Sequence, residues 1–174
     1  MQAPELQVSE WFNTNEDLRL SDLKGKAVLI EAFQMLCPGC VMHGIPLAQK
    51  VQRHFPSDKV AVIGLHTVFE HHDAMTPVSL KAFLHEYRIT FPVAVDTQGA
   101  GPLPETMSAF GMRGTPSLIL LDQAGRIAAH HFGQVSELQL GAEIGYLLAG
   151  RAASTTTSPR TEVSGRCDDS GCPV

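Results

Sequence analysis

The sequence of 174 residues predicts one α/β domain in which helices cover both faces of a mixed central β-sheet. Three observations carry this prediction. Two near-continuous apolar runs, residues 27–33 and 60–65, are typical of strands that are buried on both faces. After each run, apolar residues recur at spacings of three and four, as they do in helices. Residues 117–132 have the pattern of an antiparallel hairpin.

The first half of the chain begins with an irregular lead-in, residues 11–24, that precedes the first strand. Pro38 stands where the first residue of the following helix is expected, a position that proline favours. The apolar spacing extends this helix to about His54. Pro46 lies inside it and should kink it, because proline has no backbone N–H to donate.

The second half continues the alternation after a polar loop, residues 66–77. We expect the remaining elements in this order: a helix around 80–87, a short strand at 91–95, one helical turn at 106–110, a hairpin of strands 117–121 and 126–132 with its turn at 122–125, and a helix over 138–148. Residues 1–150 therefore form the domain. Residues 152–164 are mostly Ala, Ser and Thr, which predicts that 151–174 is a flexible tail.

Composition excludes several classes of protein. The chain is 44% hydrophobic and 18% charged, which can fill a core and excludes wholesale disorder. Its formal net charge is −5, and no run of Lys and Arg could make a basic face, so we expect no nucleic-acid partner. The apolar stretches are too short to cross a bilayer, so we expect no membrane partner.

Two close pairs of cysteines, Cys37/Cys40 and Cys167/Cys172, are the most informative feature. Residues 1–5 contain no basic residue and no apolar segment of a secretory signal, so a cytoplasmic location is expected if Met1 is the native start. In a reducing cytosol, paired cysteines are more often catalytic, redox-sensing or metal-binding than structural.

The sequence Cys37-Pro38-Gly39-Cys40 lies between a buried strand and a helix, which favours redox chemistry. Cys37 is placed at the helix N-terminus, where backbone N–H groups and the helix dipole favour a thiolate. Cys40 lies one turn further along and can resolve a mixed disulfide formed by Cys37. Half of a zinc site has the same spacing, and His43 or the cysteines of the tail could complete such a site.

In these residues the chain resembles the thioredoxin superfamily, in its TlpA-like and redoxin (AhpC/TSA-type) branch. The matching segments are residues 23–30, 37–40, 111–118 and 120–127. The resemblance implies a thioredoxin-like fold with an αβ insertion over roughly 66–95. It also implies a thiol–disulfide oxidoreductase that needs no cofactor or metal. Its partners would be a protein or small-molecule disulfide and an upstream thiol donor.

The resemblance also implies roles for individual residues. Pro116 would be the cis-proline that faces the active site, and Thr115 would offer backbone hydrogen bonds to a bound peptide. Glu31 matches the buried acid of thioredoxin, which could relay a proton near Cys40; the alternative is a Glu at the strand end that is solvated or paired with a Lys. Two departures stand out: Leu36 replaces the usual Trp, and Pro46 falls about one residue later than the family's kink proline.

Three further interpretations remain open. Peroxiredoxin-like peroxide reduction is the alternative activity, but Gln34 and Ile30 occupy the positions of the Thr and Pro of peroxiredoxins. The His-rich loop at 66–73 could bind a metal or a partner, or be merely solvated. Cys167 and Cys172 could form a redox relay with the first pair, be incidental or regulatory thiols, or share a zinc site with it.

Overall fold

The computed structural model describes residues 1–150, in which one six-stranded sheet has the strand order β1-β4-β3-β2-β5-β6. The strands are β1 (Val8–Phe12), β2 (Ala27–Phe33), β3 (Val60–His66), β4 (Val93–Asp96), β5 (Ser117–Leu121) and β6 (Ile127–Phe132). The helices are α1 (Ile45–His54), α2 (Pro77–Glu86), α3 (Glu105–Ala109) and α4 (Glu137–Leu148). A 3₁₀ turn η1 (Leu20–Leu23) precedes β2, and a π-helical turn η2 (Cys40–Gly44) precedes α1.

Strand β2 is the centre of the sheet, and all seven of its residues are buried. It runs parallel to β3 and antiparallel to β5, so the sheet is mixed, as the sequence predicts. The parallel pairing of β3 with β4 and the antiparallel hairpin of β5 and β6 complete this part of the sheet. The predicted αβ insertion corresponds to α2 and β4.

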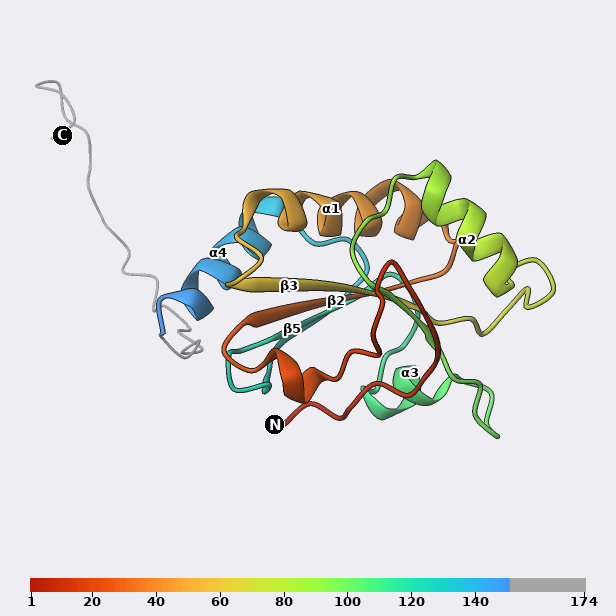
Figure 1. The fold of residues 1–174 in the computed structure, drawn as a ribbon, viewed down its shortest axis with the longest axis horizontal. Coiled ribbons are helices and arrows are strands. Elements are labelled where there is room, and N and C mark those ends of the chain that lie inside the picture. The colour runs from red at the N-terminus through yellow and green to blue at the C-terminus, as the bar shows by residue number, and fades with distance from the viewer. Residues whose placement is uncertain (151–174) are drawn as a thin grey trace, which may run out of the picture.

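Helices cover both faces of the sheet (Figure 1). Helices α1, α2 and α4 lie on one face, where Leu29 and Phe33 of β2 pack beneath them. Helix α3 and the N-terminal segment lie on the other face, against Val28 and Ile30. Alternate side chains of β2 thus pack into two separate hydrophobic cores, one on each face of the sheet. This explains why the sequence of β2 is a continuous apolar run.

Strand β1 corrects the predicted irregular lead-in, residues 11–24, at its first two residues, and it adds residues 8–10, for which no element is predicted. Residues 8–12 pair antiparallel with β4 and form one edge of the sheet. The strand is short, its register shifts between Val8 and Glu10, and Ser9 and Glu10 are exposed. An edge strand of this kind has neither a buried run nor a clear alternation, so its pattern resembles that of a loop.

The N-terminal segment reaches across the sheet to the opposite edge. Gln2 forms an isolated bridge with Arg126, and its Nε2 donates to the carbonyl oxygen of Gly125 at 3.0 Å. Ala3 and Leu6, between that bridge and β1, pack against the core on the α3 face. Residues 1–12 are therefore a strap that joins the two edges of the sheet.

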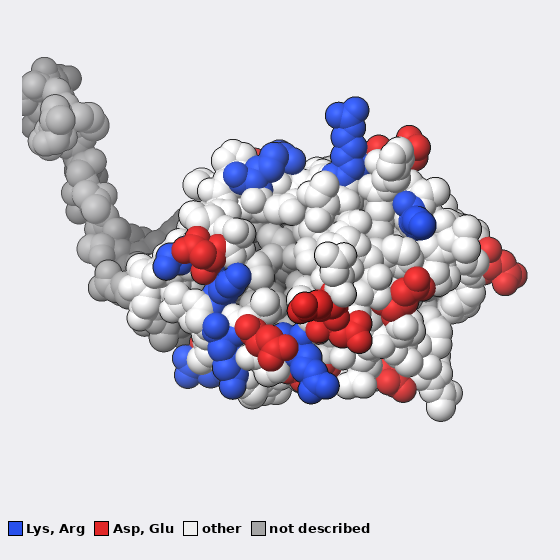
Figure 2. Space-filling view, in the orientation of Figure 1, with Lys and Arg blue, Asp and Glu red and all other residues white. Residues whose placement is uncertain are grey.

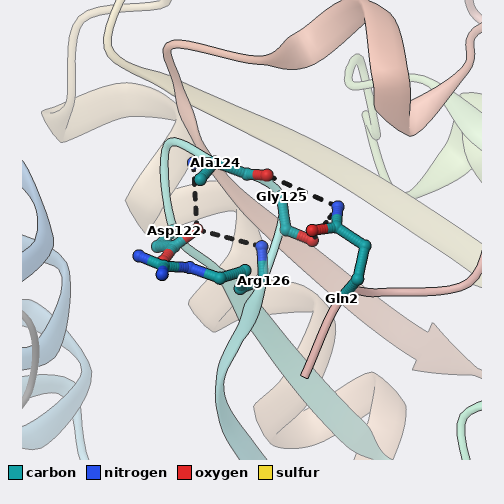
Figure 3. A network of polar contacts seen from close by, with 5 residues as sticks. All are labelled: Gln2, Asp122, Ala124, Gly125 and Arg126. Atoms are coloured by element: carbon teal, nitrogen blue, oxygen red, sulfur yellow. Dashed lines mark hydrogen bonds and ion pairs between the residues drawn. The ribbon is translucent and has the colours of Figure 1, made fainter.

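The predicted turn of the β5–β6 hairpin is built around Asp122 (Figure 3). Its Oδ1 accepts the backbone N–H groups of Ala124 and Arg126, each at 2.9 Å, and its Oδ2 accepts Arg126 Nε at 2.8 Å. Burial acts to raise the pKa of Asp122, but these hydrogen bonds and the Arg126 charge outweigh it and lower the pKa. Gly125 supplies the positive φ that the turn requires.

The surface carries mixed charge on the face shown in Figure 2, where acidic and basic side chains lie among a larger uncharged area. Of the helices within residues 1–150, none is long and apolar enough to cross a membrane.

Candidate active site at the Cys37–Cys40 dithiol

The two cysteines lie where the central strand passes into a helix. Residues 34–36 turn the chain out of β2, and helical geometry begins at Pro38. Cys37 is half-buried, whereas Cys40 is fully buried, and both are free thiols. The Cys40 N–H donates to Cys37 Sγ at 3.4 Å, and Cys37 Sγ–H donates to the Thr115 carbonyl at 3.5 Å. Cys37 is therefore the sulfur that an external disulfide can approach.

The segment before β5 forms the wall opposite the dithiol. The Thr115–Pro116 peptide bond is cis, and the Pro116 carbonyl accepts the Gly133 N–H at 2.9 Å. Two glycines pack on the Pro116 ring: a Cβ built on Gly39 or on Gly44 would lie 3.2 Å from it. The dithiol, Thr115 and Pro116, which are far apart in sequence, thus meet at one site.

The π-helical turn explains the late position of Pro46. A π turn closes i to i+5 hydrogen bonds, here from Ile45 N–H to the Cys40 carbonyl, and so takes up one residue more than an α turn. It also places Gly39 and Gly44, five residues apart, on the same side against Pro116. In a regular α-helix, two residues five apart would point about 140° away from each other.

Glu31 is buried beneath this turn, with a side-chain exposure of 1%. Its Oε1 has no hydrogen-bond partner among the described residues and points at Gly44, where any side chain would overlap it. Burial raises the pKa of Glu31 well above its ordinary value, and the nearby charge of Cys37 adds to this shift. The carboxyl therefore keeps its proton to a higher pH than an exposed glutamate does.

Burial also raises the pKa of the Cys40 thiol, and the adjacent Cys37 adds to the effect. A thiol of this kind is a poor nucleophile until a base removes its proton. Glu31 is buried in the same central strand as Leu29 and Phe33, on the sheet face where Cys40 is buried, and it interacts electrostatically with Cys37.

Gln34 is a functional candidate whose role the sequence does not reveal. It is buried, its Nε2 lies 3.3 Å from Glu70 Oε1 and 3.4 Å from Thr115 Oγ1, and its Oε1 accepts the Phe69 N–H at 3.2 Å. Gln34 therefore joins the loop after β3 to the Thr115–Pro116 segment. The only signal in the sequence is that an amide stands where peroxiredoxins have a hydroxyl.

Three apolar side chains on the segments that form the site are exposed. Leu36, which precedes it, is 57% exposed, and Met42 is 66% exposed. Phe132 is 50% exposed, contacts the Gly114 position and lies under the guanidinium of Arg113 at 5.1 Å. Leu36, Met42 and Phe132 are called the apolar rim below; exposed apolar side chains often mark the contact surface for another polypeptide.

The structure does not bring the side chains of the His-rich loop, residues 66–73, together as a metal site. His66 is buried in the core beside Phe33, whereas His71, His72 and Asp73 are exposed. Within residues 1–150, no group of three or more His, Cys, Asp or Glu side chains is arranged to hold a metal ion. Cys167 and Cys172 lie outside the described residues, so the relay stays a prediction.

Known structures resemble the whole described domain. The crystal structure of thioredoxin-like superfamily protein SPOA0173 is 71% identical, with a TM-score of 0.85 over 87% of this chain and 99% of that one. A thiol-disulfide isomerase from Corynebacterium glutamicum is 53% identical, with a TM-score of 0.81 over 84% of this chain and 96% of that one. Thioredoxin-like protein YneN of Bacillus subtilis is 27% identical over 139 residues, 80% of this chain and 74% of YneN.

The fold and the dithiol, together with these relatives, define a thioredoxin-like oxidoreductase. The family model of the AhpC/TSA family matches residues 1–130. The chain belongs to the AhpC/TSA family, in agreement with the resemblance seen in its sequence.

Proposed function

We propose that the protein exchanges disulfides with polypeptide substrates through Cys37 and Cys40. The observation that carries this proposal is the contrast between the two thiols: Cys37 is half-exposed and accepts the Cys40 N–H, whereas Cys40 is fully buried. An accessible thiol beside a protected one is the arrangement that a mixed-disulfide mechanism requires.

In the first step, the Cys37 thiolate attacks one sulfur of the substrate disulfide. A bond forms between Cys37 Sγ and that sulfur, and the other substrate sulfur leaves as a thiolate that takes a proton from solvent. The backbone N–H of Cys40 donates to Cys37 Sγ and stabilises its negative charge.

In the second step, Cys40 resolves the mixed disulfide. Glu31 in its carboxylate form accepts the Cys40 proton, and the Cys40 thiolate attacks Cys37 Sγ. The Cys37–Cys40 disulfide forms, the bond between Cys37 and the substrate breaks, and the second substrate sulfur leaves as a thiolate that takes a proton from solvent. The protein loses two electrons and the substrate gains two; an upstream thiol donor returns the protein to the dithiol by the reverse steps.

Thr115 and Pro116 form the surface on which the substrate chain binds. Thr115 touches Cys37 through its carbonyl and Gln34 through its hydroxyl, so its position relative to the nucleophile is fixed. An extended peptide that lies along this segment brings its disulfide to Cys37, and the apolar rim of Leu36, Met42 and Phe132 contacts its side chains.

Gln34 argues against a specialised peroxidase. Its amide already contacts Glu70, Thr115 and Phe69, and it has no hydroxyl to orient a peroxide. Any thiolate reacts slowly with peroxide, so a weak reaction is expected in both cases.

The test compares how fast the fully reduced protein loses thiols to a peptide disulfide and to hydrogen peroxide at equal concentration. We expect faster loss with the disulfide and loss of this reaction in Cys37→Ser. We expect Cys40→Ser to accumulate a mixed disulfide that mass spectrometry detects on Cys37. Faster loss with peroxide would refute the proposal, as would a Cys37→Ser variant that still reacts.

A further inference from the structure

The loop that follows β3 is anchored at the edge of the sheet where the dithiol lies. Each of residues 67–69 has a backbone group in a hydrogen bond of 2.8–3.2 Å to another segment, and the partners are Phe33, Gln98 and Gln34. Three consecutive residues of the loop are thus held in place. Glu70 follows them directly, so its backbone has a fixed position at this edge.

The amide of Gln34 connects Glu70 to the segment on which a substrate binds. Because Gln34 Oε1 accepts the Phe69 N–H, its Nε2 faces the other way. Nε2 donates to Glu70 Oε1 at 3.3 Å and to Thr115 Oγ1 at 3.4 Å, one hydrogen for each acceptor. The Glu70 carboxylate is therefore no further from the Thr115 hydroxyl than these two contacts combined.

Glu70 is exposed, although the amide that holds it is buried. Within residues 1–150, no Lys, Arg or His side chain forms an ion pair with it. Arg113, which lies two positions before Thr115, has its guanidinium over the Phe132 ring of β6, and β2 and β5 separate β6 from β3 in the sheet. The carboxylate of Glu70 is thus held at the surface and is open to a cation from outside.

The position of Glu70 matters because Thr115 also touches the nucleophile. Cys37 Sγ lies 3.5 Å from the Thr115 carbonyl oxygen, so a substrate cysteine bonded to Cys37 stands beside Thr115. The residues next to that cysteine then pass close to Glu70. A Lys or Arg side chain is long and carries its charge at its end, so it can reach the carboxylate from there.

We propose that Glu70 binds a basic side chain of the substrate, and that the protein thereby selects polypeptide disulfides with a Lys or Arg beside the reactive cysteine. This inference rests on the proposed function, which places the substrate chain along Thr115. Gln34 is a positioning residue, because its amide holds the Glu70 carboxylate next to that chain. Neither residue takes part in the exchange of bonds at Cys37; Glu70 changes only which disulfides arrive there and bind.

The test uses disulfide dimers of one short peptide in three versions, with Lys, Gln or Glu next to its single cysteine. Mass spectrometry follows the mixed disulfide that each forms with Cys37 in a Cys40→Ser background, at low and high salt. Glu70→Gln removes the charge, and Glu70→Lys reverses it. The control is Glu86→Gln, which removes an exposed carboxylate at the end of α2 and changes the net charge equally.

The quantity compared is the selectivity, the rate with the Lys peptide divided by the rate with the Glu peptide, because the peptides' own reactivity cancels between variants. We expect Glu70→Gln to lower the selectivity about fivefold at low salt, the upper range for an exposed ion pair. High salt should reduce this difference to less than about twofold through screening. Glu70→Lys should make the Glu peptide the faster substrate. Gln34→Met, which removes the amide, should lower the selectivity about twofold, whereas a purely structural defect would slow all three peptides alike.

Equal selectivity in Glu70→Gln and in the parent protein would overturn the inference. An equal loss of selectivity in Glu86→Gln would also overturn it, because the net charge of the protein would then explain the effect. If Gln34→Met does not fold, the two variants of the exposed Glu70 decide the question alone. If none of the peptides reacts with Cys37, the proposed function fails; if all three react and the selectivity does not change, only the role of Glu70 fails.

Discussion

His66 shows how one buried residue ties stability to pH. Its ring lies 5.4 Å from that of Phe33, it is 1% exposed, and neither ring nitrogen has a hydrogen-bond partner within residues 1–150. Burial lowers the pKa of His66 from 6.5 to about 4, because the charged imidazolium is poorly solvated there. Between pH 6.5 and about 4, His66 is therefore neutral in the folded protein but protonated in the unfolded chain.

We predict that His66 destabilises the fold in acid. Above pH 6.5 the ring is neutral in both states, and between pH 6.5 and 4 only the unfolded state binds the proton. The folded state should lose about 3 kcal/mol over this range. Urea unfolding of the native protein and of His66→Leu at pH 7 and 4.5 measures the difference.

Glu31 acts in the opposite sense, because its raised pKa makes protonation favour the folded state as the pH falls. Both proteins retain Glu31, so the comparison isolates His66. His85→Leu, at an exposed position, is the control and should follow the native protein. Equal pH dependence in His66→Leu and in the native protein would contradict the prediction.

At the scale of elements, the π turn and α4 offer a matched pair of glycines. A methyl group on Gly44 would overlap Glu31 Oε1, whereas one on Gly145, in α4, would meet no atom within 4 Å. Alanine ordinarily favours a helix over glycine, so the two positions should respond with opposite sign.

We predict that Gly44→Ala lowers the free energy of unfolding by about 1–3 kcal/mol through overpacking. Gly145→Ala should raise it by about 0.5–1 kcal/mol. Glu31→Ala should remove most of the effect of Gly44→Ala, because it removes the carboxyl that the methyl group would strike. Urea unfolding of the four variants measures this coupling, and strict additivity would rule out the contact.

The elements also show what a sequence can predict here. Strands β2 and β3 and the hairpin are found because burial on both faces, or a turn with Asp122 and Gly125, leaves a local pattern. Strand β1 is missed because it is a short edge strand with exposed residues, and its pairing with β4, more than eighty residues away, leaves no local pattern. In the same way, the position of Glu31 follows from its motif, but the contacts of Gln34 depend on two distant segments, the loop after β3 and the segment before β5.

At the scale of the whole molecule, Cys167 and Cys172 remain candidates for a redox relay. Cys167 lies 17 positions after Gly150, a length of chain that spans at most about 60 Å when fully extended. A domain of about 150 residues has a radius of gyration near 15 Å, so this length allows contact with Cys37 from any point on its surface.

We predict that mild oxidation of Cys40→Ser links Cys37 to Cys167 or Cys172, because Cys37 then has no nearer partner. Peptide mapping by mass spectrometry identifies the bond, and size-exclusion chromatography distinguishes a link within one chain from one between two. The control lacks residues 151–174. If the full chain yields only a Cys167–Cys172 bond and a free Cys37, the relay is wrong.

The strap formed by residues 1–12 has a consequence for folding during synthesis. Gln2 bonds to Gly125, 123 residues later in the chain, and β1 pairs with β4. These residues leave the ribosome long before their partners are synthesised. During that time Trp11 and Leu6 lack their native contacts with the core. Contacts between such distant residues form slowly. Residues 1–12 are therefore synthesised first but reach their native positions late. The domain can complete its fold only after the β5–β6 hairpin has left the ribosome.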